Sequence, residues 1–398
     1  MLKAAVPIND SRDLNLEKAL HNGELKFFFQ PKVSFLTGEI VGGEALIRWI
    51  KPDGTIVPPN DFIPNAERSG FITDITAVML PHLIEDIEAI RPIKPDIQIA
   101  FNVSALDLHS PYLVKMLRSI IGSRRIDPGN IQIEITETAI VDASPRISAG
   151  LLDLVALGIE IVMDDYGTGY SSLDLLSRLP FSALKLDQGI VSRMTENARN
   201  THIVQSSLYM ARELSIKTIA EGVESKGAYS FLMASGCNEV QGYLISRPVP
   251  RDDFIELCRS GKTWPASSIG LLHNAWVNHT SYRRKVLDSV HAMAITEPED
   301  WHGLPKLDLV HSPSRCRLGQ WYLSETLTGN ASDFMRLEEP HRLMHAAGEH
   351  LIHRARDSKD AKTIINDIRV FMEYSDVVDG EVSRIVEKWM ERALLQRR

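Results

Sequence analysis

The feature that most constrains the fold is an alternation of short β-rich runs with helical segments between about residues 25 and 250. The β-rich runs are 25–33, 96–104, 131–137, 159–165, 182–187 and 216–224. The stretches between them carry apolar residues at helical spacing, as in RISAGLLDLVALG (146–158). This alternation predicts a parallel sheet, and its length of about 230 residues favours a closed barrel over an open sheet.

The texture of the sequence changes after about residue 268. From there to residue 398 the β-rich runs are absent, the apolar spacing is helical, and nine of the 13 histidines occur. Gly, Pro and Ser cluster in GKTWPASS (261–268), which marks the expected boundary. We therefore expect a second, all-helical region.

Charge and composition exclude several classes of protein. A net charge of -8 argues against a general nucleic-acid coat, so no DNA or RNA polymer is expected as a partner. No segment approaches the roughly 18–20 apolar residues of a membrane span, and the N-terminus lacks the apolar core of a signal peptide. Cys237, Cys258 and Cys316 are too widely spaced for a disulfide framework. We expect a cytoplasmic, reduced protein with no membrane partner.

Nearly every β-rich run ends in acidic or amide residues, with few cations among them. The set is Glu44, Arg48, Asn102, Glu134, Glu137, Asp164, Asp165, Lys185, Asp187, Glu221, Glu224 and Gln241. In a parallel barrel the carboxyl ends of the strands meet at one mouth, so these distant residues would converge. The carboxylates would repel one another there unless cations shared them, and oxygen ligands suit Mg²⁺ or Mn²⁺.

Two such ions, about 3.5–4 Å apart and bridged by a carboxylate, can clamp a phosphodiester for in-line attack. Asp164 is the expected bridge and Asp165 a ligand of the second ion. A single acidic residue at a strand end more often caps a helix or forms a salt bridge, but several at this spacing favour a metal site. We expect Glu137, Asp187 and Glu224 to orient ligands or a loop rather than bind an ion.

The motifs along this region resemble those of the EAL-type cyclic di-GMP phosphodiesterases. In chain order they are EALIRW, FIPNAERSGFI, FNVS, EITET, DDYGTGYSSL, LKLD, AEGVE and QGYLISRPVP. The resemblance covers about residues 15–257 and implies a modified TIM (β/α)₈ barrel. Its implied activity is conversion of cyclic di-GMP to linear pGpG with two Mg²⁺ or Mn²⁺ ions.

The same resemblance implies a role for each matching residue. Glu44, Asn102, Glu134 and Asp164 would hold the first ion, and Asp164, Asp165 and Glu221 the second. Lys185 would bind and polarise the attacking water, and Glu221 is an alternative general base. Gln30, Leu46, Arg48 and Gln241 would contact the dinucleotide, and Glu137 would brace the loop after the aspartates. Tyr166, Phe28 and Asn65 depart from the commoner residues, but none of them removes a ligand.

The helical region carries a second group of metal-ligand residues. His341 and His345 are four residues apart, so both imidazoles lie on one helix face, and Cys316 is the region's cysteine. Imidazoles with a thiolate favour Zn²⁺ over Mg²⁺. HNAW, CRLGQWYL and LEEPHRLMH resemble the chemoreceptor zinc-binding (CZB) domain, a helical bundle, over roughly residues 268–350. The resemblance implies one Zn²⁺ held by His273, Cys316, His341 and His345.

Two departures accompany this second resemblance. The segment between His273 and Cys316 is longer than expected for that family, and Pro340 directly precedes His341, where it could bend the helix or start it. Further histidines leave the ligand set open: His311, His350 and His353 are spares, whereas His279 and His302 are expected on polar faces.

Together the two regions predict an N-terminal tail (1–14), a phosphodiesterase barrel (15–257), a linker (258–267) and a zinc-binding regulatory domain (268–398). The expected protein is a homodimeric cyclic di-GMP phosphodiesterase regulated by zinc. Its last helix, at about 377–395, would serve the dimer or pack on its own bundle. One alternative is a non-catalytic cyclic di-GMP receptor, and another is the same enzyme regulated by oxidation of Cys316.

Overall fold

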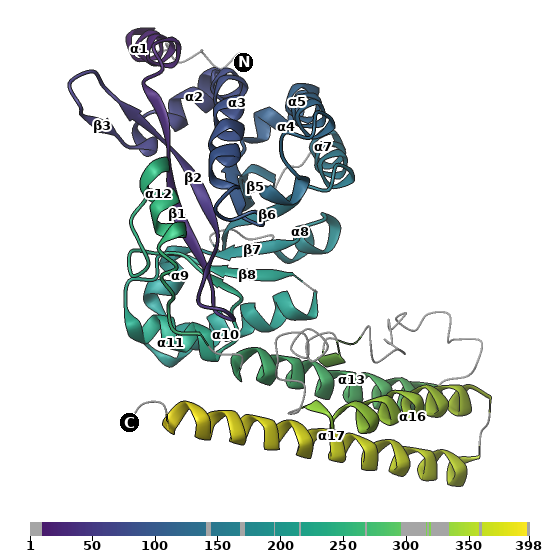
Figure 1. Ribbon diagram of the computed structural model, residues 1–398. Helices are drawn as coiled ribbons and strands as arrows, with labels where there is room; N and C mark the ends of the chain where they lie inside the picture. Colours follow the sequence, from purple (N-terminus) through teal and green to yellow (C-terminus); the bar gives the residue numbers. More distant parts are fainter. Residues whose placement is uncertain are drawn as a thin grey trace. The chain divides into compact units, whose positions relative to one another are not determined.

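The structure, a computed structural model, is drawn in Figure 1. It describes residues 10–140, 145–167, 172–194, 196–214, 216–266, 269–295, 316, 318–319, 334–357 and 360–395. The chain divides into two compact units, Met1–Ala266 and Ser267–Arg398.

Eight strands of the first unit close into a mixed barrel within the described residues. They are β1 (Leu25–Ser34), β2 (Ile40–Ile50), β4 (Gln98–Asn102), β5 (Ile131–Thr136), β6 (Glu160–Tyr166), β7 (Ala183–Leu186), β8 (Lys217–Ala220) and β9 (Glu239–Val240). From β2 through to β9 each strand is parallel to the next. The predicted barrel is confirmed.

The first strand departs from the predicted parallel order. β1 runs antiparallel to both β2 and β9. Only residues 35–39 connect β1 to β2, and a parallel crossover needs a dozen or more residues, so the pair forms a hairpin. Two short strands, β3 (Ile56–Val57) and β10 (Val249–Pro250), extend the sheet antiparallel to β2 and β1.

Helices fill the connections and cover the outside of the barrel (Figure 1). They are α2 (Ile63–Ser69), α3 (Ile72–Ile90), α4 (Ala105–His109), α5 (Pro111–Gly122), α6 (Glu137–Ile140), α7 (Pro145–Ala156), α8 (Ser172–Arg178), α9 (Gln188–Arg193), α10 (Ala198–Glu213), α11 (Lys226–Ala234) and α12 (Arg251–Arg259). A further helix, α1 (Asp10–His21), precedes β1.

Alternate residues of β5 face either the hydrophobic core or the polar interior of the barrel. Ile131, Ile133 and Ile135 of β5 are buried in the main hydrophobic cluster. The residues between them, Gln132 and Glu134, bond to polar side chains of other strands. Because successive side chains of a strand point to opposite faces, the apolar set packs under the helices and the polar set faces the barrel interior.

The second unit is helical in the part that the structure describes, as predicted. Its helices are α13 (Ile269–Ile295), α16 (Glu338–Asp357) and α17 (Ala361–Leu395), and their buried faces share one apolar cluster that includes Val286, Leu351 and Phe371. Pro340 is the third residue of α16, so it lies in the first turn, where no intrahelical N–H is lost. No described helix is long and apolar enough to cross a membrane.

Candidate active site and metal sites

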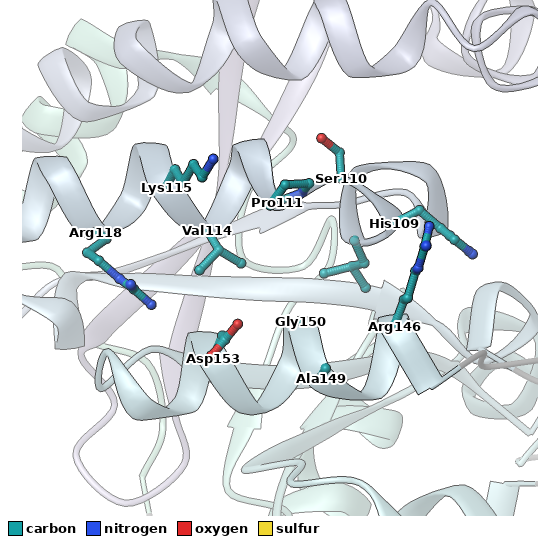
Figure 2. A pocket seen from close by; sticks show the side chains of 11 residues that line it. His109, Ser110, Pro111, Val114, Lys115, Arg118, Arg146, Ala149, Gly150 and Asp153 are labelled. Atoms are coloured by element: carbon teal, nitrogen blue, oxygen red, sulfur yellow. The ribbon is translucent and has the colours of Figure 1, made fainter.

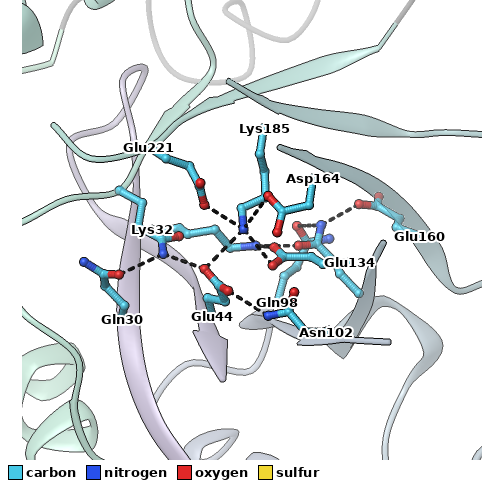
Figure 3. Close-up of polar contacts among 12 residues, drawn as sticks. Gln30, Lys32, Glu44, Gln98, Asn102, Glu134, Glu160, Asp164, Lys185 and Glu221 are labelled. Carbon is cyan, nitrogen blue, oxygen red and sulfur yellow. Dashed lines mark hydrogen bonds and ion pairs between the residues drawn. The ribbon is translucent and has the colours of Figure 1, made fainter. Parts of the chain in front are cut away.

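The carboxyl ends of the parallel strands bring polar side chains from distant segments to one mouth of the barrel (Figure 3). β2 supplies Glu44, β5 supplies Glu134, β6 supplies Asp164 and β7 supplies Lys185, while Glu221 follows β8 directly. The convergence that the strand-end pattern predicts is therefore present in the structure.

The ammonium group of Lys185 lies at the centre of this mouth. Its Nζ is 3.2 Å from Glu44, 2.8 Å from Glu134, 3.2 Å from Asp164 and 2.6 Å from Glu221. The lysine side chain is 1% exposed. One ammonium group thus faces four carboxyl groups, and further cations in this mouth would stabilise the charged forms of those carboxyl groups.

The carboxylates form two groups that share one member. Ligand oxygens of Glu44, Glu134 and Asp164 lie within 4.8 Å of one another, and so do those of Asp164, Asp165 and Glu221. Oε1 of Glu134 is also buried without a hydrogen bond from any described residue. All of these donors are oxygens, so the two groups fit hard divalent cations such as Mg²⁺ or Mn²⁺.

A break in β6 brings the two adjacent aspartates to the same mouth. The register between β6 and β7 shifts between Met163 and Tyr166, and Asp165 has a φ of 55°. In a regular strand Asp164 and Asp165 would point to opposite faces, whereas a bulge re-aims one side chain. This left-handed residue is the local reason why Asp165 can join Asp164 and Glu221.

Burial and neighbouring charges shift the pKa values of the clustered carboxyl groups in opposite directions. Burial raises the pKa of Glu134 to about 8. For Glu44 burial is outweighed by Lys185 and by hydrogen bonds from Gln241 and Asn102, which lower its pKa to about 2. Burial also raises the pKa of Glu221 well above its ordinary value. Burial therefore disfavours the charged forms of Glu134 and Glu221, whereas the partners of Glu44 stabilise its charged form.

Amide side chains surround Glu44. Nδ2 of Asn102 donates to its Oε1 at 2.8 Å, and Nε2 of Gln241 donates to its Oε2 at 2.7 Å. Gln241 also donates to Oε1 of Gln30 at 3.0 Å. Leu46 and Arg48 follow Glu44 at intervals of two residues in β2, so all three lie on the same face of the strand. Arg48 is half-buried. The residues expected to contact a substrate therefore adjoin the carboxylates.

The three residues expected in supporting positions differ in their surroundings. Glu137 starts α6, is fully buried, and accepts from the backbone N–H of Gly167 in the turn after the aspartates (3.4 Å). Asp187 caps α9 by accepting from Gly189 N at 2.9 Å. Glu224 is exposed. Among the described residues of the turn, contact is thus seen for Glu137 but not for Glu224.

Sequence reasoning missed Lys32, a fully buried lysine whose side chain runs in among the carboxyl groups (Figure 3). Its Nζ donates to Gln132 at 2.6 Å and lies 3.9 Å from Oε1 of Glu134. Gln132 in turn donates to Glu160 at 2.8 Å. Lys32 has the same strand parity as Gln30 in β1, so the period of two could have placed it inside the barrel.

A separate pocket of about 410 Å³ lies between α5 and α7 (Figure 2). Lys115 and Arg118 line it from α5, and Arg146 and Asp153 from α7. None of its described lining residues belongs to the carboxylate cluster. The candidate active site is therefore the barrel mouth.

The helical unit contains a buried cluster of three histidines and one cysteine. Ligand atoms of His279, Cys316, His341 and His345 lie within 4.8 Å of one another. His273 lies in α13, but its side chain is outside the described residues, as are His302 and His311. His279 occupies the fourth position of this cluster, which differs from the expectation that His279 lies on a polar face.

The remaining spare histidines are exposed. His350 lies 3.7 Å from Asp367, and His353 lies 4.0 Å from Glu349. The signal for His279 was its spacing, because His279, Tyr282, Val286 and Val290 form one buried stripe of α13 at helical period. His273 is six residues away, about 240° around the helix.

The distances in the cluster suit a tetrahedral ion. Nε2 of His341 and Nε2 of His345 are 3.2 Å apart, and Nδ1 of His279 is 3.8 Å from Sγ of Cys316. Zinc bond lengths at a tetrahedral angle require about 3.3 Å between two nitrogens and about 3.6 Å between nitrogen and sulfur. Burial lowers the pKa of His341 to about 3 and that of His279 well below its ordinary value. Both imidazoles are therefore neutral, as metal ligands must be.

Comparisons with known protein families agree with this organisation. Residues 13–248, more than half of the chain, match the EAL domain. The chain belongs to the EAL family. Residues 279–352 match the chemoreceptor zinc-binding domain, so the EAL domain is followed by a CZB domain. The second match begins at His279 and includes Cys316, His341 and His345.

Several relatives share the EAL domain. The cyclic di-GMP phosphodiesterase PdeR of Escherichia coli is 34% identical over 242 residues, covering 61% of this chain and 36% of PdeR. The cyclic di-GMP phosphodiesterase RocR of Pseudomonas aeruginosa is 32% identical over 241 residues, covering 61% of this chain and 62% of RocR. The chain thus spans less than two-thirds of each of these curated relatives.

A solved structure extends the likeness to three dimensions. The PaMucR phosphodiesterase in complex with c-di-GMP matches with a TM-score of 0.58 and 34% identity. The match covers 61% of this chain and 99% of that chain. The EAL domain of the present chain therefore matches nearly the whole of a phosphodiesterase chain that was solved in complex with c-di-GMP.

Proposed function

We propose that the EAL domain hydrolyses cyclic di-GMP to linear pGpG. The observation that carries the proposal is the pair of carboxylate groups that share Asp164 and surround Lys185. Asn102 would complete the first group, since it already contacts Glu44. The names of PdeR and RocR and the c-di-GMP complex of PaMucR support this substrate.

The two cation sites would be filled by Mg²⁺ or Mn²⁺. When bound, such ions would offset the charge of the phosphodiester and lower the pKa of an attacking water. Lys185 would hold that water by hydrogen bonding from Nζ. Glu221, which lies beside Lys185, would accept its proton. Nζ of Lys185 is 2.6 Å from Oε1 of Glu221, so a water beside this pair would be within reach of both groups.

The substrate would lie over the amide side of the mouth. Arg48 would bind a phosphate through its guanidinium fork, and Gln30, Leu46 and Gln241 would contact the rest of the dinucleotide. Glu137 would hold the turn after the aspartates through Gly167. Asp187 would fix the start of α9 through Gly189, and Glu224 would act only in a supporting position outside the ligand groups.

The CZB domain would bind one Zn²⁺ through His279, Cys316, His341 and His345. The distances from His341 to His345 and from His279 to Cys316 are close to those of tetrahedral zinc, which supports this set. His273 is about 240° around α13 from His279, so the two would not share one site. Zinc binding would couple to packing of the helices, because α13 and α16 each supply ligands. We further propose that zinc regulates turnover, that the protein is a cytoplasmic homodimer, and that residues 15–257 and 268–398 are the two domains, joined by 258–267.

One assay tests the proposed function. The full chain is incubated with cyclic di-GMP and Mg²⁺ at buffered free zinc concentrations, and pGpG is quantified by chromatography. Release of pGpG that changes with free zinc is the expected result. Binding of cyclic di-GMP without release of pGpG would identify a receptor instead. A turnover rate that changes with mild oxidant but not when a chelator removes zinc would favour control through oxidation of Cys316.

A further inference from the structure

Met344 places a thioether against the histidine cluster of the helical unit. It lies in α16 between His341 and His345 and is 0% exposed. Its Sδ is 2.9 Å from Nε2 of His279, which belongs to α13. A methionine at helical spacing ordinarily fills a core, but this sulfur faces a ring nitrogen rather than only carbon.

The two ring nitrogens of His279 face different partners. Nδ1 faces Sγ of Cys316 at 3.8 Å, close to the ligand-to-ligand edge of tetrahedral zinc. Nε2 faces Met344. An imidazole that binds a metal through one nitrogen carries its proton on the other, which usually donates to a carboxylate, a carbonyl or water. Here the partner of the second nitrogen is a sulfur atom.

We infer that Met344 is a positioning residue for the zinc ion. Its Sδ accepts the Nε2–H of His279, which holds the ring in the tautomer that leaves the Nδ1 lone pair for the metal. The inference rests on the zinc site proposed above and adds a residue to it. Loss of such a partner ordinarily lowers metal affinity about 10–100-fold, and thioether sulfur is a weak acceptor, so the expected loss is about tenfold.

Two substitutions separate hydrogen bonding from packing. Met344→Leu keeps an apolar side chain of similar volume but removes the acceptor. Met344→Gln restores an acceptor, because its amide carbonyl can take the same N–H. Met293→Leu is the matched control, since Met293 packs against the same apolar cluster and lies outside the ligand group. Zinc affinity of each full-length chain is measured by competition with a chelator, and unfolding of the zinc-free chains checks their folds.

We expect Met344→Leu to raise the zinc Kd about tenfold while Met344→Gln and Met293→Leu stay within about threefold of the wild type. An unchanged Kd for Met344→Leu, or an equal loss for the leucine and glutamine variants with intact folds, would overturn the inference. In the cobalt-substituted wild type a four-coordinate spectrum with one thiolate is expected. A five-coordinate spectrum that becomes four-coordinate in Met344→Leu would make Met344 a ligand and contradict its positioning role.

The zinc site itself is tested separately. Wild-type chain that binds no zinc, or Cys316→Ala chain that binds it as tightly as wild type, would refute the proposed zinc site. Wild-type binding that is lost in Cys316→Ala but indifferent to Met344→Leu would refute only the role of Met344. The two failures are therefore distinct.

Discussion

Asp164 belongs to both carboxylate groups, and its position explains why one substitution should be so costly. We predict that Asp164→Asn lowers cyclic di-GMP turnover by about 1,000-fold or more, because a neutral amide cannot bridge two divalent cations. Formation of pGpG is measured with Mg²⁺, and circular dichroism checks the fold. Asp153→Asn, on the exposed face of α7, serves as the control and should retain activity. Wild-type turnover in Asp164→Asn would contradict the bridging role.

Cys316 offers the sulfur of the second site, and the barrel site contains none. We predict that Cys316→Ala lowers bound zinc from one ion per chain to well below one, with no change in Mg²⁺-dependent turnover at low zinc. The metal content is measured by mass spectrometry after dialysis. Cys258→Ala, in α12 of the barrel unit, should keep its zinc. Equal zinc content in the two variants would contradict the assignment.

The limits of sequence-based prediction are clear for single residues. The strand-end acids were predictable because the period of two and the parallel order together place them at one mouth. Lys32 was missed because a lysine is seldom expected inside a strand core, although its parity matches that of Gln30. The choice between His273 and His279 depends on which face of α13 packs on α16, and tertiary packing sets that face.

At the scale of elements, a buried carboxyl group of α4 accepts a hydrogen bond from α3. Asp107 closes the capping box of α4 with Ser104 and accepts from Oγ1 of Thr76 at 3.2 Å. Burial raises its pKa to about 6 from a reference of 3.8. The folded state therefore binds a proton more tightly than the unfolded state, so stability should fall as pH rises between these two values.

We predict that Asp107→Asn removes this dependence, since its amide oxygen still accepts hydrogen bonds but does not titrate. The free energy of unfolding of the variant, relative to wild type, should rise by on the order of 2–3 kcal/mol between pH 4 and pH 7. Urea unfolding at several pH values measures it. Asp74→Asn, exposed on α3, should instead follow the wild type across this range. If the free energies of unfolding of Asp107→Asn and of wild type changed in parallel with pH, a raised pKa of Asp107 in the folded state would be contradicted.

The elements themselves were predictable to different degrees. The runs 131–137 and 159–165 fall on β5 and β6 within one residue at each end. The last helix was expected at about 377–395 but starts at Ala361, because its first half shares the apolar spacing of the second. The bulge at Asp165 was not predictable, since no glycine or proline marks the left-handed position.

At the scale of the whole molecule, each unit has its own apolar core. We predict that a chain ending at residue 266 folds and hydrolyses cyclic di-GMP at a rate that no longer responds to zinc. Turnover of the full and shortened chains is compared at several free zinc concentrations, with sedimentation measured in parallel. If the shortened chain is inactive and monomeric while the full chain is dimeric, the helical unit acts through assembly.

The closure of the barrel has a consequence for the order in which the protein can become functional. Val33 of β1 pairs with Val240 of β9, and Gln30 bonds to Gln241, across more than 200 residues of chain. A ribosome must therefore synthesise almost the whole EAL domain before β1 can pair with β9. Nascent chains shorter than about 250 residues would expose an open sheet edge, where chaperones or other nascent chains can bind. Catalytic competence should consequently arise late in translation and in a single step.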